Sequence, residues 1–386
     1  MITLLAKVFI RAKDGTEERQ AYGMLCGVVG VALNILLFIG KFIAGTISHS
    51  IAITADAFNN LSDAGSSCVT LVGFRLAGTK PDSGHPFGHG RIEYISGLIV
   101  SGVILIMAFE LIRDSVKKII NPQETAFSVI SCVILAVSIL VKLYMSYYNK
   151  AVGEKISSAA MKATALDSLS DVCATSAVLL TTFIDRFTGL HIDGFCGVLV
   201  GLFIFYAGIQ AAKETLNPLL GQPPKQEFVE EITKIVMQEK LVRGIHDLVV
   251  HDYGPGRVMI SLHAEVPADV NILKIHDVID NIEEKLRKEL GCEAVIHMDP
   301  VVTNDPQVVE LKRKIKAILA EIDPKINLHD FRVVEGDTHT NIIFDVVVPY
   351  DYRLSDEELV EQLTEQVQEH IGKQYFLVVK VDKAYS

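Results

Sequence analysis

Two pairs of polar residues, each four positions apart, interrupt stretches of the sequence that are otherwise apolar. Asn59 and Asp63 lie in the stretch from 51 to 74, and Asp167 and Asp171 lie in the stretch from 163 to 184. Residues four apart share one face of a helix, so each pair presents its oxygens in one direction. A carboxylate in mid-membrane costs about 3 kcal/mol, and such residues normally line a cavity or a binding site. The four residues therefore predict a polar site between two membrane helices.

The ligand atoms of this predicted site are all oxygens, with neither imidazole nor thiolate among them. Oxygen sets suit Mn²⁺, Mg²⁺ or Ca²⁺ better than Zn²⁺ or Cu⁺. The three carboxylates carry a formal charge of -3, which offsets a dication and takes up protons once the ion has left. A hard divalent cation is therefore favoured. The alternative is that the four residues make hydrogen bonds between helices or lie near a helix end.

A polar loop between the second and third apolar stretches contains a second candidate metal site. It reads Asp82-Ser-Gly-His85-Pro-Phe-Gly-His89-Gly-Arg91, which places three potential ligands within eight residues. Asp82, His85 and His89 form this candidate site. The alternative is that the two histidines cap helices and contact lipid headgroups, with Arg91 as an interfacial anchor.

A third set of potential ligands lies in the later, acidic part of the chain, mostly on or beside predicted strands. We predict a cytoplasmic metal cluster from five residues: His246, His263, His276, His297 and Asp299. Taken singly, each of these histidines is more often an exposed surface residue.

The elements that position these residues begin with six apolar stretches. The chain is 49% hydrophobic and only 22% charged, too apolar for an ordinary soluble protein. A bilayer core of about 30 Å requires ~20 apolar helical residues. The stretches cover about 20–40, 51–74, 94–116, 125–148, 163–184 and 194–212. Twelve Lys and Arg, with Lys142 counted among them, fall on one side of these spans and five on the other, so both ends are predicted to be cytoplasmic.

The pattern changes after Asn217-Pro218 to short strands between amphipathic helices. Residues 225–298 predict the order αββαβ, and residues 305–382 predict the same order again. Gly244-Ile-His-Asp-Leu returns as Asn327-Leu-His-Asp-Phe. The predicted fold is therefore a membrane α-helical domain of six transmembrane helices, 1–217, followed by two αββαβ, ferredoxin-like cytoplasmic domains in tandem, 218–300 and 301–386.

The second soluble copy is predicted to be degenerate and structural. Asp345 stands where the first copy has His263, and Lys380 stands where it has His297. Only His329 and Asp382 remain of the potential ligands.

Charge and cysteine content exclude several other classes of protein. The net charge is -11, and residues 1–217 are close to neutral, so the acidity lies in the soluble part. An acidic soluble part disfavours nucleic acid as a partner. The six cysteines include no Cys-x-x-Cys pair, which argues against a zinc finger and against a disulfide framework.

Taken together, these features resemble the cation diffusion facilitator family over residues 5–300. The resemblance implies a homodimeric, proton-coupled exporter of divalent metal in the cell membrane. Its partners are metal ions, protons, lipid and a second copy of the chain, and metal is its substrate, with no prosthetic group. The transport site is then formed by the residues of spans two and five: Asn59, Asp63, Asp167 and Asp171.

The resemblance also bears on the choice of metal. Zinc members of the family usually place His or Asp at the first ligand position of span two and His at the first of span five. Here those positions hold Asn59 and Asp167, a departure that resembles the manganese-exporting branch. The loop and cytoplasmic sets match secondary sites of zinc members, which keeps Zn²⁺, Fe²⁺ and Co²⁺ open as substrates.

Functions of other classes remain as alternatives to transport. Two membrane aspartates, Asp63 and Asp167, could form a proteolytic dyad. A protease would not require Asn59 and Asp171, which lie four positions from the two aspartates, or the histidine-rich soluble domain. A non-transporting metal sensor and a passive channel are the further alternatives. We predict a secondary active transporter, not an enzyme.

Overall fold

The computed structural model describes residues 15–47, 51–121, 129–188, 192–302, 304–336 and 339–384. The chain separates into two compact units. The first comprises residues 1–222 together with 252–257, and the second comprises residues 223–251 together with 258–386.

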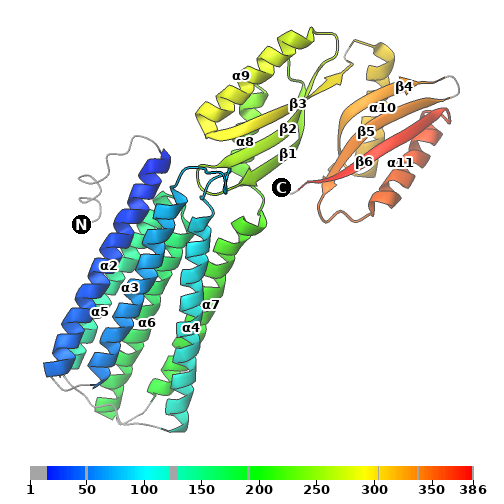
Figure 1. Cartoon of the computed structure of the whole chain (residues 1–386). Helices are drawn as coiled ribbons and strands as arrows, with labels where there is room; N and C mark the ends of the chain where they lie inside the picture. The colour runs from blue at the N-terminus through cyan, green and yellow to red at the C-terminus, as the bar shows by residue number, and fades with distance from the viewer. Residues whose placement is uncertain are drawn as a thin grey trace. The chain divides into compact units, whose positions relative to one another are not determined.

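The first unit is a bundle of long helices (Figure 1). They are α2 (Gly15–Ile47), α3 (Ile51–Ala77), α4 (Ile92–Ile120), α5 (Val129–Lys155), α6 (Ala159–Thr188) and α7 (Asp193–Leu220). The most extensive packing joins α2 to α3, α4 to α7 and α5 to α6. Helix α7 runs through Pro218 and ends at Leu220, and the φ of 86° at the following Gly221 lies in the left-handed region typical of a helix C-terminus. The compact unit that contains this helix continues to residue 222.

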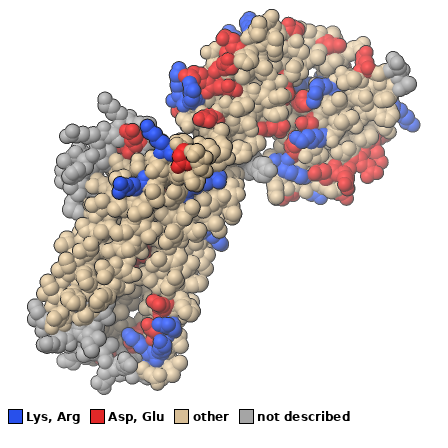
Figure 2. Space-filling model, in the orientation of Figure 1, with Lys and Arg blue, Asp and Glu red and all other residues tan. Residues whose placement is uncertain are grey.

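Five of the described helices are long and apolar enough to cross a membrane, namely α2, α4, α5, α6 and α7. Helix α3, which contains the predicted span 51–74, has 27 residues but carries Asp56, Asn59, Asn60 and Asp63 and is not among the five. Figure 2 shows few charged side chains between the two ends of the bundle on the visible face. Such a surface suits contact with lipid.

The second unit contains two successive sets of helices and strands in the order αββαβ. The first set is α8 (Gln226–Val236), β1 (Gly244–Asp252), β2 (Val258–Pro267), α9 (Ile272–Leu290) and β3 (Cys292–Val301). The second set is α10 (Pro306–Ile322), β4 (Asn327–Glu335), β5 (Thr340–Pro349), α11 (Asp356–His370) and β6 (Tyr375–Ala384). Each set forms a mixed three-stranded sheet, β1-β2-β3 and β4-β5-β6, in which the last two strands are parallel.

Each set has its own apolar core between helices and sheet. Along β2, Leu262 and Ala264 are buried in the core, whereas His263 between them points to the opposite face of the sheet. His263 is the register partner of His297 on β3. The alternation of the strands thus places His263 and His297 together on the face that the core does not cover.

The two sets share an unusual backbone feature at the same motif position. Asp247 in the first His-Asp pair and Asp330 in the second have φ values of 50° and 49°. Positive φ is uncommon outside glycine, and aspartate is among the residues that tolerate it. In β4 the strand register shifts at this position, between His329 and Arg332. The repeated motif therefore encodes the same local irregularity twice.

Candidate metal centre

Carboxylates from two helices converge on one buried cation inside the bundle. The ammonium of Lys142, on α5, donates a hydrogen bond of 2.7 Å to Asp63 Oδ2 on α3 and one of 2.6 Å to Asp171 Oδ2 on α6. All three side chains are at most 8% exposed. Asp167, on the same face of α6 as Asp171, is 4% exposed. The structure thus brings together two of the four predicted ligands and buries a third.

Lys142 does not lie in a connection between helices, where the charge count places it. It lies within α5 and is buried beside the carboxylates. A lone lysine in an apolar stretch is costly unless an acidic partner neutralises it, and that signal was available in the sequence. The ammonium of Lys142 therefore occupies a position among three carboxylates, which is the arrangement expected of a site that binds a cation.

Helix α3 has two neighbouring asparagines, and the one that is buried is not the predicted ligand. Asn59, the predicted ligand, is exposed, whereas the adjacent Asn60 is 2% exposed. Asn60 donates its amide N–H to the carbonyl of Asp56 at 2.8 Å. Its buried oxygen Oδ1 has no hydrogen-bond partner among the described residues. Because Asn60 precedes Asp63 by three positions, the two lie on one helix face, and an unpaired buried oxygen is a position that a cation could satisfy.

The predicted loop ligands do lie together. Asp82 is 3.6 Å from Nδ1 of His85 and 3.5 Å from Nε2 of His89, and the two imidazole rings are 4.6 Å apart. Asp82 Oδ1 also accepts the backbone N–H groups of Gly84 and His85, and these hydrogen bonds lower the pKa of its carboxyl. One atom from each of the three residues could therefore hold a metal ion on this loop.

Other residues of the same loop have packing roles with the segment Asp252–Arg257, which belongs to the same unit. Arg91 donates two hydrogen bonds, of 2.7 and 3.0 Å, to the carbonyl of Asp252. Phe87 stacks on Tyr253 at 4.5 Å. Gly90 lies so close to the Tyr253 carbonyl that a Cβ there would come within 2.8 Å of it. The aromatic, glycine and arginine positions of the motif are thus explained by packing, apart from its possible ligands.

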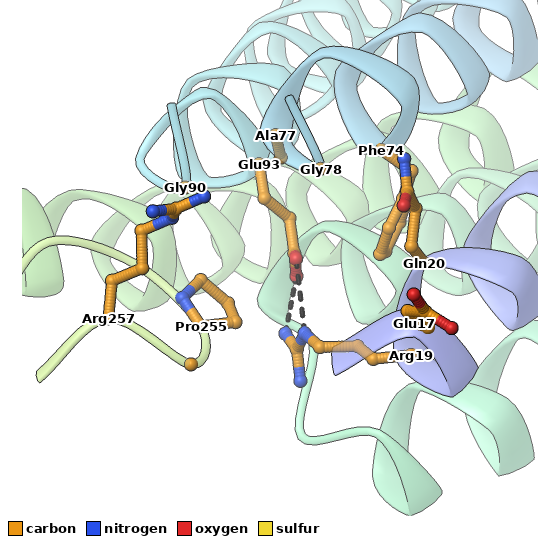
Figure 3. A pocket seen from close by; sticks show the side chains of 11 residues that line it. Glu17, Arg19, Gln20, Phe74, Ala77, Gly78, Gly90, Glu93, Pro255 and Arg257 are labelled. Atoms are coloured by element: carbon orange, nitrogen blue, oxygen red, sulfur yellow. Dashed lines mark hydrogen bonds and ion pairs between the residues drawn. The ribbon is translucent and has the colours of Figure 1, made fainter. Parts of the chain in front are cut away.

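A cavity of about 260 Å³ lies beside this segment and is lined by a buried ion pair (Figure 3). Arg19 points at Glu93, with a shortest nitrogen to oxygen distance of 2.6 Å. The hydroxyl of Ser158 donates to the same carboxylate at 2.6 Å. Arg19 neutralises the Glu93 carboxylate and Ser158 donates a hydrogen bond to it. The cavity therefore has the features of a structural contact and not of a metal site.

The predicted soluble cluster is partly assembled. Asp299 Oδ2 is 3.0 Å from Nε2 of His246 and 2.9 Å from Nδ1 of His263, and these three residues offer ligand atoms close enough for one ion. His297 is 66% exposed and lies at the edge of the group, 3.4 Å from the other oxygen of Asp299. His276 instead faces Asp280 on α9 at 3.2 Å and is exposed.

The second copy places two further titratable residues, His329 and Asp345, next to this cluster. Burial and the nearby His246 lower the pKa of His329, which favours its neutral form. Burial, together with the carboxylates of Asp382 and Asp330, raises the pKa of Asp345, although Lys380 opposes the shift. The sequence predicts no ligand role for this copy, because contacts between distant strands have no local signature.

Comparison with known proteins gives matches over most of the chain. A family model of the cation efflux transmembrane domain matches residues 27–220, and one of the cytoplasmic domain of cation efflux proteins matches residues 224–301. An uncharacterized transporter of Methanocaldococcus jannaschii is 29% identical over 275 residues, covering 71% of this chain and 97% of its own.

Two further relatives are named for the efflux of metal cations. The manganese efflux system protein MneS of Bacillus subtilis is 27% identical over 277 residues, covering 71% of this chain and 94% of its own. The cation-efflux pump FieF of Escherichia coli is 27% identical over 285 residues, covering 73% of this chain and 95% of its own. Residues 302–386 lie beyond both family models.

Proposed function

This chain belongs to the cation diffusion facilitator family of cation efflux transporters, and on that premise we propose that it exports Mn²⁺ from the cytoplasm in exchange for protons. The observation that carries the proposal is the convergence of Asp63 and Asp171, from two helices, on one buried cation. A site built to neutralise a cation away from water is what a cation transporter requires.

The preference for manganese rests on ligand chemistry. The proposed transport ligands are Asn59, Asp63, Asp167 and Asp171, with the buried Asn60 as a rival to Asn59 for the amide position. All offer oxygen, which suits Mn²⁺ better than Zn²⁺. The similarity to a protein named for manganese efflux agrees with this choice. Export of Zn²⁺, Fe²⁺ or Co²⁺ is the second candidate, favoured by the histidines of the loop and of the soluble cluster.

The proposed mechanism is alternating access. Metal enters from the cytoplasm while the helices are open inward, and the helix pair carrying the ligands then opens outward. Protons from outside bind the carboxylates, weaken their hold on the metal and return inward with the empty site. In this proposal α3 is the sixth membrane crossing, both chain ends are cytoplasmic and the soluble domains hold two copies of the chain together.

Lys142 adds a step to this cycle. Its ammonium lies 2.6 to 2.7 Å from one oxygen each of Asp171 and Asp63, so a metal ion cannot bind between the same two oxygens until the ammonium moves away. After metal release, the ammonium returns and neutralises part of the buried charge. We propose that Lys142 is a tethered cation that competes with the metal. An ammonium bound to Asp63 does not suit a proteolytic dyad of Asp63 and Asp167, because the two carboxylates of such a dyad share a proton.

Replacing Lys142 with methionine should therefore tighten Mn²⁺ binding and slow turnover. Removing the competing charge should lower the dissociation constant by about tenfold, equivalent to about 1.4 kcal/mol. Release should become slower because no tethered cation replaces the departing ion. Equilibrium dialysis of the purified protein against Mn²⁺, combined with uptake into proteoliposomes, measures both effects.

Lys41→Met is the matched control for this experiment. Lys41 is also 5% exposed and also pairs with an aspartate of α3, Asp56, at 2.8 Å. Its replacement should not tighten Mn²⁺ binding. Unchanged or weaker binding in Lys142→Met, or equal tightening in both variants, would refute the competition.

Uptake of Mn²⁺ into proteoliposomes under an imposed pH gradient tests the proposed function as a whole. An exchanger moves metal and protons in opposite directions, a channel follows the metal gradient alone, and a protease or sensor moves neither.

A further inference from the structure

The row of histidines and aspartates in the soluble unit continues from the first αββαβ copy into the second. His246 and Asp247 are neighbours on β1, and Nδ1 of His246 is 3.6 Å from Asp247 Oδ2. The ring of His246 also lies parallel to that of His329 on β4, with 4.7 Å between centroids and 8° between planes. One potential ligand atom from each of these three residues lies within 4.8 Å of the other two.

Polar atoms at this junction are buried without hydrogen bonds. The side chain of His246 is 2% exposed, and its Nδ1 atom has no hydrogen-bond partner among the described residues. The same holds for Nε2 of His329 and Oδ2 of Asp382. Buried polar atoms are normally paired, so a cluster of unpaired ones calls for a bound group that they could contact. Two imidazole nitrogens and carboxylate oxygens are the atoms that bind a transition-metal ion.

Three carboxylates meet at the junction, one from the first copy and two from the second. Asp247, Asp345 and Asp382 each offer an oxygen within 4.8 Å of the other two. Lys380 pairs with Asp382 Oδ1 at 2.9 Å, and the other oxygen of that carboxylate has no hydrogen-bond partner within the described ranges. Asp345 is the register partner of His329 on the adjacent strand. Asp345 and Lys380 occupy the positions of the first copy's His263 and His297, and the carboxylate of Asp345 lies on the strand beside His329.

We propose that the two soluble copies together form a metal site with His246, Asp247 and His329 as ligands and with Asp345 and Asp382 as the surrounding negative charge. Two imidazoles and a carboxylate favour Zn²⁺ or Co²⁺ over Mn²⁺ or Mg²⁺. The site ties β1 of the first copy to β4 of the second. The second copy is then a ligand-bearing domain and not only a structural one.

This junction site is distinct from the group formed by His246, His263 and Asp299. The two groups use different nitrogens of His246, because Nε2 faces Asp299 and Nδ1 faces Asp247. His329 lies past residue 301, where the match to the cytoplasmic family domain ends. A variant at His329 therefore perturbs the junction site and spares the other group, and its outcome does not depend on whether the protein transports metal.

The test is Zn²⁺ binding to the full-length purified protein, with the stoichiometry measured by equilibrium dialysis. His329→Ala should bind one Zn²⁺ fewer per chain than the unmodified protein, or bind the last one at least tenfold more weakly. Asp247→Asn, which removes only charge and keeps the side-chain size, should show a smaller loss in the same direction. His370→Ala is the matched control, because His370 is an exposed histidine of the same copy at the end of α11.

A second measurement separates loss of the site from loss of the fold. Zn²⁺ should raise the thermal midpoint of the unmodified protein more than that of His329→Ala, while the two metal-free proteins have similar midpoints and helix content. Unchanged stoichiometry and affinity in His329→Ala would overturn the proposal. The same reduction in His370→Ala, or a collapse of the metal-free His329→Ala protein, would overturn it as well.

Discussion

Replacing Asp63 or Asp171 with alanine should lower Mn²⁺ transport by a factor of about 100 or more. Each change removes a charged ligand and also leaves Lys142 with only one of its two ion-pair partners. Removing one partner of a buried charge pair costs about 2 kcal/mol or more of binding free energy, and about 1.4 kcal/mol corresponds to a factor of ten in affinity. Initial rates of Mn²⁺ uptake into proteoliposomes, at equal amounts of reconstituted protein, measure the loss.

Asp56→Asn is the matched control for these two variants. Asp56 lies on the same helix as Asp63 and also pairs with a buried lysine, Lys41. Its side chain is 29% exposed, so the cost of neutralising it is smaller. This variant should keep most of the transport activity. Transport at the unmodified rate in Asp63→Ala or Asp171→Ala would remove the basis for the site.

The second large effect should be on selectivity. Asp167→His, alone or with Asn59→His, should shift the preference from Mn²⁺ toward Zn²⁺ by about tenfold or more, since imidazole suits Zn²⁺ and a compact four-ligand geometry. The change also removes a carboxylate that can bind protons. The measured quantity must therefore be the ratio of Mn²⁺ to Zn²⁺ transport at several pH values, and not an absolute rate.

Asn60 provides the internal comparison for this experiment. Asn59 is exposed and Asn60 is buried with an unpaired oxygen. If Asn60 supplies the amide ligand, Asn60→His should change the ratio more than Asn59→His does. A preference for Zn²⁺ in the unmodified protein, or a fixed ratio in all active variants, contradicts the oxygen-site argument for manganese.

Much of the architecture follows from local patterns in the sequence. Apolar stretches of about 20 residues mark membrane-type helices because a bilayer sets the length that they must span. Alternation in the soluble part marks strands with one buried face, as Leu262, His263 and Ala264 illustrate. The carboxylates of α3 and α6 could be found because charge in a largely apolar stretch is costly and therefore easy to notice.

The parts that could not be predicted depend on contacts between distant elements. That Lys142 meets Asp63 and Asp171 requires three helices to come together, and the sequence shows only that it interrupts an apolar stretch. The choice between Asn59 and Asn60 depends on the rotation of α3, since positions three and four before Asp63 share a face. The approach of His329 to His246 joins two separate sheets and has no signature in either repeat.

The measurement that bears most directly on the central proposal is metal and proton flux in proteoliposomes containing the purified protein. Mn²⁺ and internal pH are followed together, with an imposed pH gradient and no metal gradient. The proposed exchange predicts that Mn²⁺ moves against the direction of proton flow, that reversing the pH gradient reverses Mn²⁺ movement, and that the double variant Asp63→Ala, Asp171→Ala does neither. Two results would contradict proton-coupled export through these carboxylates. One is Mn²⁺ movement that does not depend on the pH gradient and follows only the Mn²⁺ gradient. The other is equal Mn²⁺ movement in the double variant.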